Sequence, residues 1–259
     1  MKKIFITATA AIFITTLVIW STNPTTAEKS DSVKEVTTQI VEQKTTDEVK
    51  TMKKKIKRID LIQANTLFLF EEVLPQNSAE LAAKITKLDN GSKEPLYLLI
   101  DSPGGSVFAG AKVISAIEAS IRPVYTVCVG LCASMGAMIH SYGHKRLATD
   151  RSVLMYHPAS GGFQGPFPRA KSLFGTVERY VNKMEVNIST RSGMSREVYE
   201  QHVLRDFWID AEDAKVLNLI DDLVVIDTSA LTPPVAEIFL KRANNLNDLT
   251  TFPDVWMKH

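Results

Sequence analysis

The sequence predicts an α/β protein with a largely parallel sheet. Apolar, strand-like runs alternate with amphipathic, helix-like segments, and the connections between them are short. Runs such as Leu96–Ile100 and Val124–Val129 are continuously apolar, as expected of strands that are covered on both faces. Strands that alternate with helices across short connections imply right-handed crossovers and parallel pairing. The length of 259 residues allows one large domain or two small ones.

The expected elements follow one another between Thr66 and Ile226. Apolar residues three or four apart mark the helices; Leu81, Ile85 and Leu88 form such a stripe, with Asn77 or Ser78 as the cap. The expected strands are Thr66–Phe70, Leu96–Ile100, Val124–Val129, Val153–Tyr156 and Leu223–Ile226. The expected helices are Asn77–Leu88, Ser106–Ala119, Ala133–Tyr142, Leu173–Arg191, Ser195–Leu204 and Ala211–Leu217.

Residues 1–27 have the layout of a secretory signal. Lys2 and Lys3 precede an uncharged run, Ile4–Trp20, and small polar residues follow it up to Ala27. The run is close to the roughly 20 apolar residues that cross a membrane, so an uncleaved anchor stays open beside a cleaved signal. Cleavage after Ala27 would remove two of the 30 basic residues and none of the 29 acidic ones, which takes the net charge from +1 to −1. Neither value indicates binding to nucleic acid.

Two further segments flank the expected domain, which spans residues 59–226. Residues 28–58 lack glycine, proline and aromatic residues and are rich in charge, which predicts a linker. Its lysine cluster, Lys53–Lys55, could touch acidic lipid. Residues 227–259 follow the last expected strand and include the break Thr232-Pro233-Pro234. A packed arm at a subunit interface and a loose tail both remain open for this extension of unknown role.

Two glycine-bearing turns follow two consecutive apolar strands of the sequence. They stand out because the first 90 residues contain no glycine. The first turn, Asp101–Ser106, has two glycines after a proline, which permits a tight turn with exposed backbone N–H groups. Such a turn at a helix start can hold an anion or a developing oxyanion. The second turn, Gly130–Ala137, places Ser134 at the start of a helix. A plain turn and an N-cap serine are the structural alternatives for the two segments.

Two more side chains complete a candidate set for nucleophilic catalysis. His157 ends the strand Val153–Tyr156, where it is placed to take a proton from Ser134. Asp206 lies beside Phe207 and could orient that histidine, with a helix cap or an arginine partner as the alternative.

The remaining histidines and cysteines predict no second site. His140 and His144 are expected at the surface or as caps. Cys128 and Cys132 lack partners for a metal site, and we do not expect them to form a disulfide. We therefore predict neither a metal nor a cofactor.

Taken together, these motifs resemble those of the ClpP-type serine peptidases, the proteolytic subunits of the Clp protease. The resemblance covers residues 59–226. It rests on Asp101–Val107, Cys128–Ala137, Met155–Pro158, Gly162–Gly165 and Arg205–Ala214, in that order. It implies a crotonase/ClpP-like fold, a repeated β-β-α superhelix with a mostly parallel sheet. It also implies a homo-oligomeric ring that encloses the active sites.

The resemblance also implies a role for each candidate residue. Ser134 would be the nucleophile, His157 the general base and Asp206 the orienting acid. The oxyanion hole would consist of the backbone N–H groups of Gly105 and Met135. The segment 161–165 would pair with an extended peptide as an added strand. The substrate-binding residues would be Gly104, Ser106, Gly162, Phe163, Gln164 and Gly165.

Some features depart from the family pattern. Pro166 and Pro168 interrupt the segment that joins two rings in the family, and proline cannot donate to a strand ladder. Leu204 stands where the family usually has an acid, two residues before the catalytic aspartate. These departures favour a single ring or a smaller oligomer. The leader predicts a periplasmic, secreted or outward-facing membrane-anchored protein, separated from cytosolic ATP, so we expect an ATP-independent peptidase without a Clp ATPase.

Three other functions are compatible with parts of the sequence. The first is a Ser/Lys peptidase similar to signal peptide peptidase A, in which Lys145 or Lys171 would replace His157 as the base. The second is a crotonase-type acyl-CoA enzyme, which the serine nucleophile and the leader disfavour. The third is a non-catalytic assembly subunit that keeps the fold.

Overall fold

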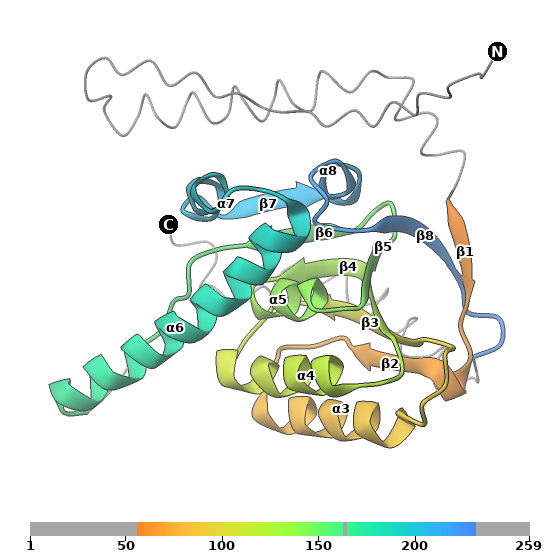
Figure 1. Ribbon diagram of the computed structural model, residues 1–259, viewed down its shortest axis with the longest axis horizontal. Coiled ribbons are helices and arrows are strands. Elements are labelled where there is room, and N and C mark those ends of the chain that lie inside the picture. The colour runs from red at the N-terminus through yellow and green to blue at the C-terminus, as the bar shows by residue number, and fades with distance from the viewer. Residues whose placement is uncertain (1–55, 163–164, 232–259) are drawn as a thin grey trace, which may run out of the picture.

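The computed structural model describes residues 56–162 and 165–231, which form a single eight-stranded sheet with helices packed against it (Figure 1). The strands are β1 (Lys57–Asp60), β2 (Thr66–Leu69), β3 (Leu96–Ser102), β4 (Val124–Ala133), β5 (Lys145–Ala148), β6 (Val153–Tyr156), β7 (Phe207–Asp210) and β8 (Asp222–Asp227). The helices are η1 (Gln63–Asn65), α3 (Pro75–Leu88), α4 (Val107–Ala119), α5 (Met135–Ser141), α6 (Phe167–Ser192), α7 (Arg196–Val203) and α8 (Ala211–Val216).

The sheet runs in the order β1-β8-β5-β4-β3-β2, with β6 joined to β4 and β7 joined to β6. Each pairing is parallel except that of β6 with β7. This arrangement confirms the predicted α/β fold with a mostly parallel sheet. The predicted leader (1–27), nearly all of the predicted linker (28–58), Phe163, Gln164 and residues 232–259 lie outside the described residues.

Three short strands, β1, β5 and β7, were not predicted by the sequence pattern. Each is only four residues long, and each contains charged side chains that break the apolar pattern. In β5 the Arg146 side chain is buried and forms an ion pair with Asp221, with 2.5 Å between Arg146 Nη2 and Asp221 Oδ1. Strand β1 begins at Lys57, two residues before the expected start of the domain at Ile59.

Two helices begin earlier than predicted because proline starts them. Helix α3 begins at Pro75, where the missing N–H has no helical partner to lose. Asn77 and Ser78 are therefore its third and fourth residues and neither is its cap. The Asn77 side-chain oxygen accepts a hydrogen bond from the Leu74 N–H at 2.9 Å. Helix α6 begins after Pro166, with Pro168 in its first turn. The N-terminal half of α6 extends beyond the sheet (Figure 1).

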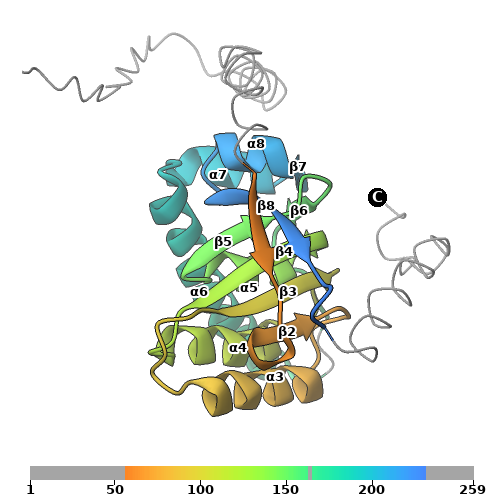
Figure 2. The same cartoon turned by 90° about the vertical axis from the view of Figure 1, so that its right-hand side faces the viewer.

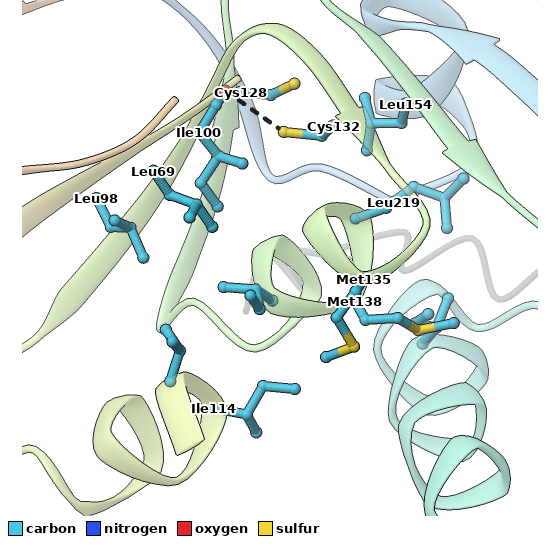
Figure 3. Close-up of a cluster of buried hydrophobic side chains, with 14 of the residues drawn as sticks. Leu69, Leu98, Ile100, Ile114, Cys128, Cys132, Met135, Met138, Leu154 and Leu219 are labelled. Carbon is cyan, nitrogen blue, oxygen red and sulfur yellow. Dashed lines mark hydrogen bonds between the residues drawn. The ribbon is translucent and has the colours of Figure 1, made fainter. Parts of the chain in front are cut away.

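Strand side chains alternate between two apolar clusters on opposite faces of the sheet. The larger cluster combines Leu98 and Ile100 of β3 with residues of α3, α4 and α5, and Figure 3 shows part of it. Cys128 and Cys132 are free, buried thiols in this cluster. The smaller cluster contains the intervening residue, Leu99, and its members come from strands and loops without any residue of a described helix.

His140 corrects an expectation, because it is completely buried in α5 instead of lying at the surface. Its Nε2 lies 2.9 Å from the Leu147 carbonyl oxygen, and burial lowers its pKa to about 4. His144 is exposed, and its Nδ1 accepts from the Val124 N–H at 3.1 Å, as expected of a capping residue. Within the described ranges, no helix has the length and apolar character needed to cross a membrane.

Candidate active site

Ser134 occupies a sharp turn between a strand and a helix. Strand β4 ends directly before it, and helix α5 begins directly after it. Its backbone has φ 53° and ψ −123°, which is uncommon for a residue with a side chain. The Ser134 N–H donates to the carbonyl oxygen of Met155 at 2.8 Å, which anchors the turn to the end of β6. Strain of this kind is retained where the surrounding structure enforces it, and it is concentrated at active sites.

The Ser134 hydroxyl lies within hydrogen-bond distance of His157. The distance between Ser134 Oγ and His157 Nε2 is 2.7 Å. The sheet produces this contact, because β4 and β6 are parallel and pair Ala133 with Met155. The residues that follow the two strands therefore emerge at the same edge. The sequence predicts this meeting, and the structure brings the two side chains together.

Asp206 approaches His157 through a strand that the sequence did not reveal. Strand β7 pairs antiparallel with β6 and sets Phe207 opposite Tyr156. Continuing this register by one residue sets Asp206 opposite His157. Asp206 also has a positive φ of 55°, as Ser134 does. The predicted trio is thus gathered at one edge of the sheet, with Asp206 close enough for its charge to act on the imidazole.

The surroundings of His157 keep its imidazole neutral at pH 7. Burial of the ring is the largest influence and lowers its pKa below the ordinary value of 6.5. The charge of Asp206 and a hydrogen bond with the Pro158 backbone both raise the pKa, but they do not outweigh burial. A neutral imidazole beside a serine hydroxyl can act as a general base.

The turn at residues 103–106 packs directly against Ser134. A Cβ atom on Gly104 would lie 2.5 Å from Ser134 Cβ and 2.9 Å from the Met135 nitrogen. Gly104 also has a φ of +102°, so both space and backbone conformation require glycine there. Because Met135 is the first residue of α5, its N–H has no partner within the helix.

Val73 holds this turn in place, and no sequence motif indicated its role. Its N–H donates to the Gly104 carbonyl at 2.6 Å, and its carbonyl accepts from the Ser106 N–H at 2.9 Å. A Cβ on Gly105, which has φ +139°, would lie 2.6 Å from the Val73 oxygen. The predicted oxyanion residues Gly105 and Met135 therefore belong to two turns that touch, one of which is clamped by Val73.

Asp101 links the two turns through a hydrogen bond that the sequence does not reveal. Its Oδ1 accepts a hydrogen bond from the Leu131 N–H at 3.0 Å. A Cβ on Gly130 would lie 2.9 Å from the same oxygen, so glycine permits this approach. The only sequence feature available was an acidic residue and a glycine at the ends of adjacent strands, which is too common to be specific.

Four of the six predicted substrate-binding residues lie within the described ranges: Gly104, Ser106, Gly162 and Gly165. Ser106 caps α4, and its hydroxyl oxygen accepts from the Ala109 N–H at 3.3 Å. Gly161 and Gly162 are exposed, and a Cβ on either would meet no atom within 4 Å. Gly165 has φ 146°, whereas Phe163 and Gln164 lie outside the described residues.

Neither lysine considered as an alternative base contacts Ser134. The Lys145 ammonium lies 3.5 Å from an Asp222 carboxylate oxygen, between β5 and β8. Lys171 is exposed on α6. Across residues 56–162 and 165–231, no His, Cys, Asp or Glu side chains form a group of three or more that could hold a metal ion.

Comparisons with known proteins identify similar chains. A family model described as Clp protease matches residues 55–227. The chain is 38% identical over 165 residues to the ATP-dependent Clp protease proteolytic subunit 3 of Synechococcus sp. (strain CC9605), covering 61% of this chain and 81% of the relative. It is 34% identical over 168 residues to proteolytic subunit 2 of Prochlorococcus marinus (strain MIT 9312), covering 63% of this chain and 83% of the relative. Subunit 3 of Parasynechococcus marenigrum (strain WH8102) is 37% identical over 165 residues, with coverage of 61% and 81%.

Replacing Gly104 by alanine should strongly slow the reaction of Ser134 with a fluorophosphonate probe. The added Cβ would displace Ser134 or Met135, and misplacement by about 1 Å can reduce a rate on the order of 100-fold. Gly91→Ala is the matched control, because Gly91 also has a positive φ, of 72°, but has no atom within 4 Å of the added Cβ. Wild-type labelling of folded Gly104→Ala would contradict this account of the turn.

The labelling rate should also depend on the protonation of His157. Only the neutral imidazole accepts the Ser134 proton, so the second-order rate constant should fall on acidification with a midpoint below 6.5. In Asp206→Asn the charge that raises the His157 pKa is lost, so the midpoint should move to still lower pH. Rate–pH profiles of the two proteins check this, and a midpoint that rises in Asp206→Asn refutes it.

Proposed function

The chain belongs to the Clp protease family, and we propose that it is a serine endopeptidase that cleaves peptides or unfolded proteins. The observation that most supports this activity is the 2.7 Å contact between Ser134 Oγ and His157 Nε2. Ser134 stands at the strained turn before α5, where the Met135 N–H is available to an external acceptor. This set of groups is the one that acyl transfer through a serine ester requires.

The first half of the reaction forms an acyl-enzyme. His157 Nε2 takes the Ser134 proton while Oγ attacks the peptide carbonyl carbon. The C=O electron pair moves onto oxygen, and the resulting oxyanion accepts hydrogen bonds from the N–H groups of Gly105 and Met135. When the C=O bond reforms, the C–N bond breaks, and the leaving amine takes the proton from His157.

The second half regenerates the enzyme. His157 takes a proton from a water molecule, whose oxygen attacks the ester carbonyl carbon. Collapse of the second oxyanion breaks the bond to Ser134 Oγ, which recovers its proton from His157, and the acid product leaves. Throughout, the Asp206 carboxylate orients the imidazole and stabilises its protonated form. Loss of one oxyanion donor should lower the rate on the order of 100- to 1000-fold.

The peptide substrate would bind next to Gly161 and Gly162. Both residues are exposed, and the space beside them is open. An extended peptide could add to this segment as a strand, in which backbone groups supply affinity without regard to side chains. This mode suits an enzyme for unfolded chains, since these expose backbone groups that folded proteins pair internally.

We further propose that the enzyme works outside the cytoplasm and without ATP. The support is the leader in residues 1–27, read as a signal peptide or membrane anchor and followed by the charged linker 28–58. The relatives are named ATP-dependent, so this is a proposed difference from them. Their names also call them subunits, which supports an assembly of several chains, and we propose a homo-oligomer for this chain. Pro166 and Pro168 favour a single ring or a smaller assembly for this chain.

Hydrolysis of a fluorogenic peptide and of unfolded casein tests the proposal. Without ATP, the wild type should cleave both, and Ser134→Ala and His157→Ala should each lose roughly 1000-fold or more of kcat/KM. Lys145→Ala is the control for a lysine base and should retain activity, because Lys145 pairs with Asp222. Apyrase treatment should leave the wild-type rate unchanged.

Each part of the proposal has its own contradictory result. Full activity in Ser134→Ala would exclude the serine mechanism, and full activity in His157→Ala with loss in Lys145→Ala would favour the Ser/Lys scheme. No hydrolysis and no fluorophosphonate label in a folded wild type would indicate a non-catalytic subunit. Hydrolysis that stops after apyrase treatment would exclude ATP independence.

A further inference from the structure

The sheet has a second apolar face, which the proposed peptidase mechanism does not use. Figures 1 and 2 show α3, α4 and α5 on one face of strands β2 to β5, and no described helix covers the other. We call this other side the outer face and define it by its half-buried side chains. These are Phe68, Phe70, Tyr97, Tyr125, Val129 and Ile226.

The outer face is built by the alternation of strand residues. In β3, Leu98 and Ile100 belong to the larger cluster, on the side of the helices, whereas Tyr97 and Leu99 belong to the smaller cluster, on the outer face. The Tyr97 and Tyr125 rings meet edge to face, with centroids 5.9 Å apart. Burial raises the pKa of the Tyr97 hydroxyl even though the ring is only partly covered. Aromatic side chains from β2, β3 and β4 thus share this face, and large apolar surface patches are places where proteins bind partners.

The end of the described chain turns onto this face. Strand β8 ends at Asp227, and the Leu231 N–H then donates to the Thr228 carbonyl at 3.0 Å, which closes a turn. Leu231 is only 7% exposed, and it packs in the same cluster as Leu99 and Val127. The last residue that the structure describes is therefore already seated on the outer face.

Residues 232–259 have the length and chemistry to continue this contact. An extended chain spans about 3.3 Å per residue, so these 28 residues can reach across the strands of a single sheet several times. Their aromatic residues are Phe239, Phe252 and Trp256. Their three basic residues balance their three acidic ones, so no net charge opposes apolar contact.

We propose that residues 232–259 bind the outer face of their own chain. Leu231 starts the contact, and the aromatic residues of the segment extend it over Tyr97 and Tyr125. Attachment at Leu231 gives the segment a high effective concentration at the face, which a separate partner would lack. The extension left open by the sequence is thereby assigned as a packed arm.

Limited proteolysis of the full chain tests the assignment, since trypsin can cut the arm after Lys241 and Arg242. Release of the C-terminal fragment, followed by mass spectrometry, should be slow in the wild type. Ile226→Glu places a charge on the outer face, so release should accelerate about tenfold or more, as the open form becomes more populated. Val225→Glu is the matched control on the same strand, because Val225 is 49% exposed and lies outside the cluster, and its rate should not change.

A second variant distinguishes loss of the arm contact from unfolding of the whole domain. Tyr125→Ser removes the aromatic ring from the outer face without adding a charge, and should also accelerate release while thermal unfolding stays cooperative. Fragment release from the wild type as fast as from both variants would overturn the proposal. Protection of the wild type that disappears on dilution would also overturn it, because the arm would then be bound by a second copy.

Discussion

The close contact between Gly104 and Ser134 is the constraint on which the rest of the site depends. The two turns touch through backbone and Cβ atoms, so the nucleophile and the glycine turn beside it cannot be positioned independently. This contact is possible because β3 and β4 are parallel neighbours whose carboxyl ends meet. The hydrogen bond from Ser134 to Met155 then fixes the positive φ of Ser134, and Val73 fixes the turn from its other side. The two turns are thus held by β6 on one side and by the Val73 backbone on the other, which is how a strained conformation persists.

The electrostatics of the site follow from the same sheet edge. His157 follows the last residue of β6, and Asp206 precedes the first residue of the antiparallel strand β7. Partial burial of the imidazole favours its neutral form, whereas the carboxylate favours the protonated form. The reaction requires both forms in turn, so these opposing influences suit a residue that must accept a proton and then return it. The opposite face of the sheet is chemically separate, because alternate residues of each strand point away from the site.

Sequence reasoning reached the fold class, the five apolar strands and the meeting of Ser134 with His157. Those features are expressed in continuous apolar runs and in glycine-bearing turns that follow them. Strands β1, β5 and β7 were not predicted. Each has only four residues and contains charged side chains, so its strand conformation depends on pairing with neighbouring strands more than on its own apolar pattern. Asp206 was predicted to orient His157, but the strand that brings it there, β7, was not predicted. The clamp by Val73 was also unpredictable, since it uses only backbone atoms of an ordinary residue. The start of α3 was predicted too late, because Asn77 is a favourable capping residue but the helix already begins at Pro75.

The central claim is that Ser134 forms a covalent bond with the substrate. Its most direct test is mass spectrometry of the full chain, quenched in acid during turnover of an activated ester and then digested. An added acyl group should be found on the peptide that contains Ser134 in the wild type, and it should be absent from Ser134→Ala. Hydrolysis without any acylated intermediate, or an acyl group on a different residue that is required for turnover, would contradict it.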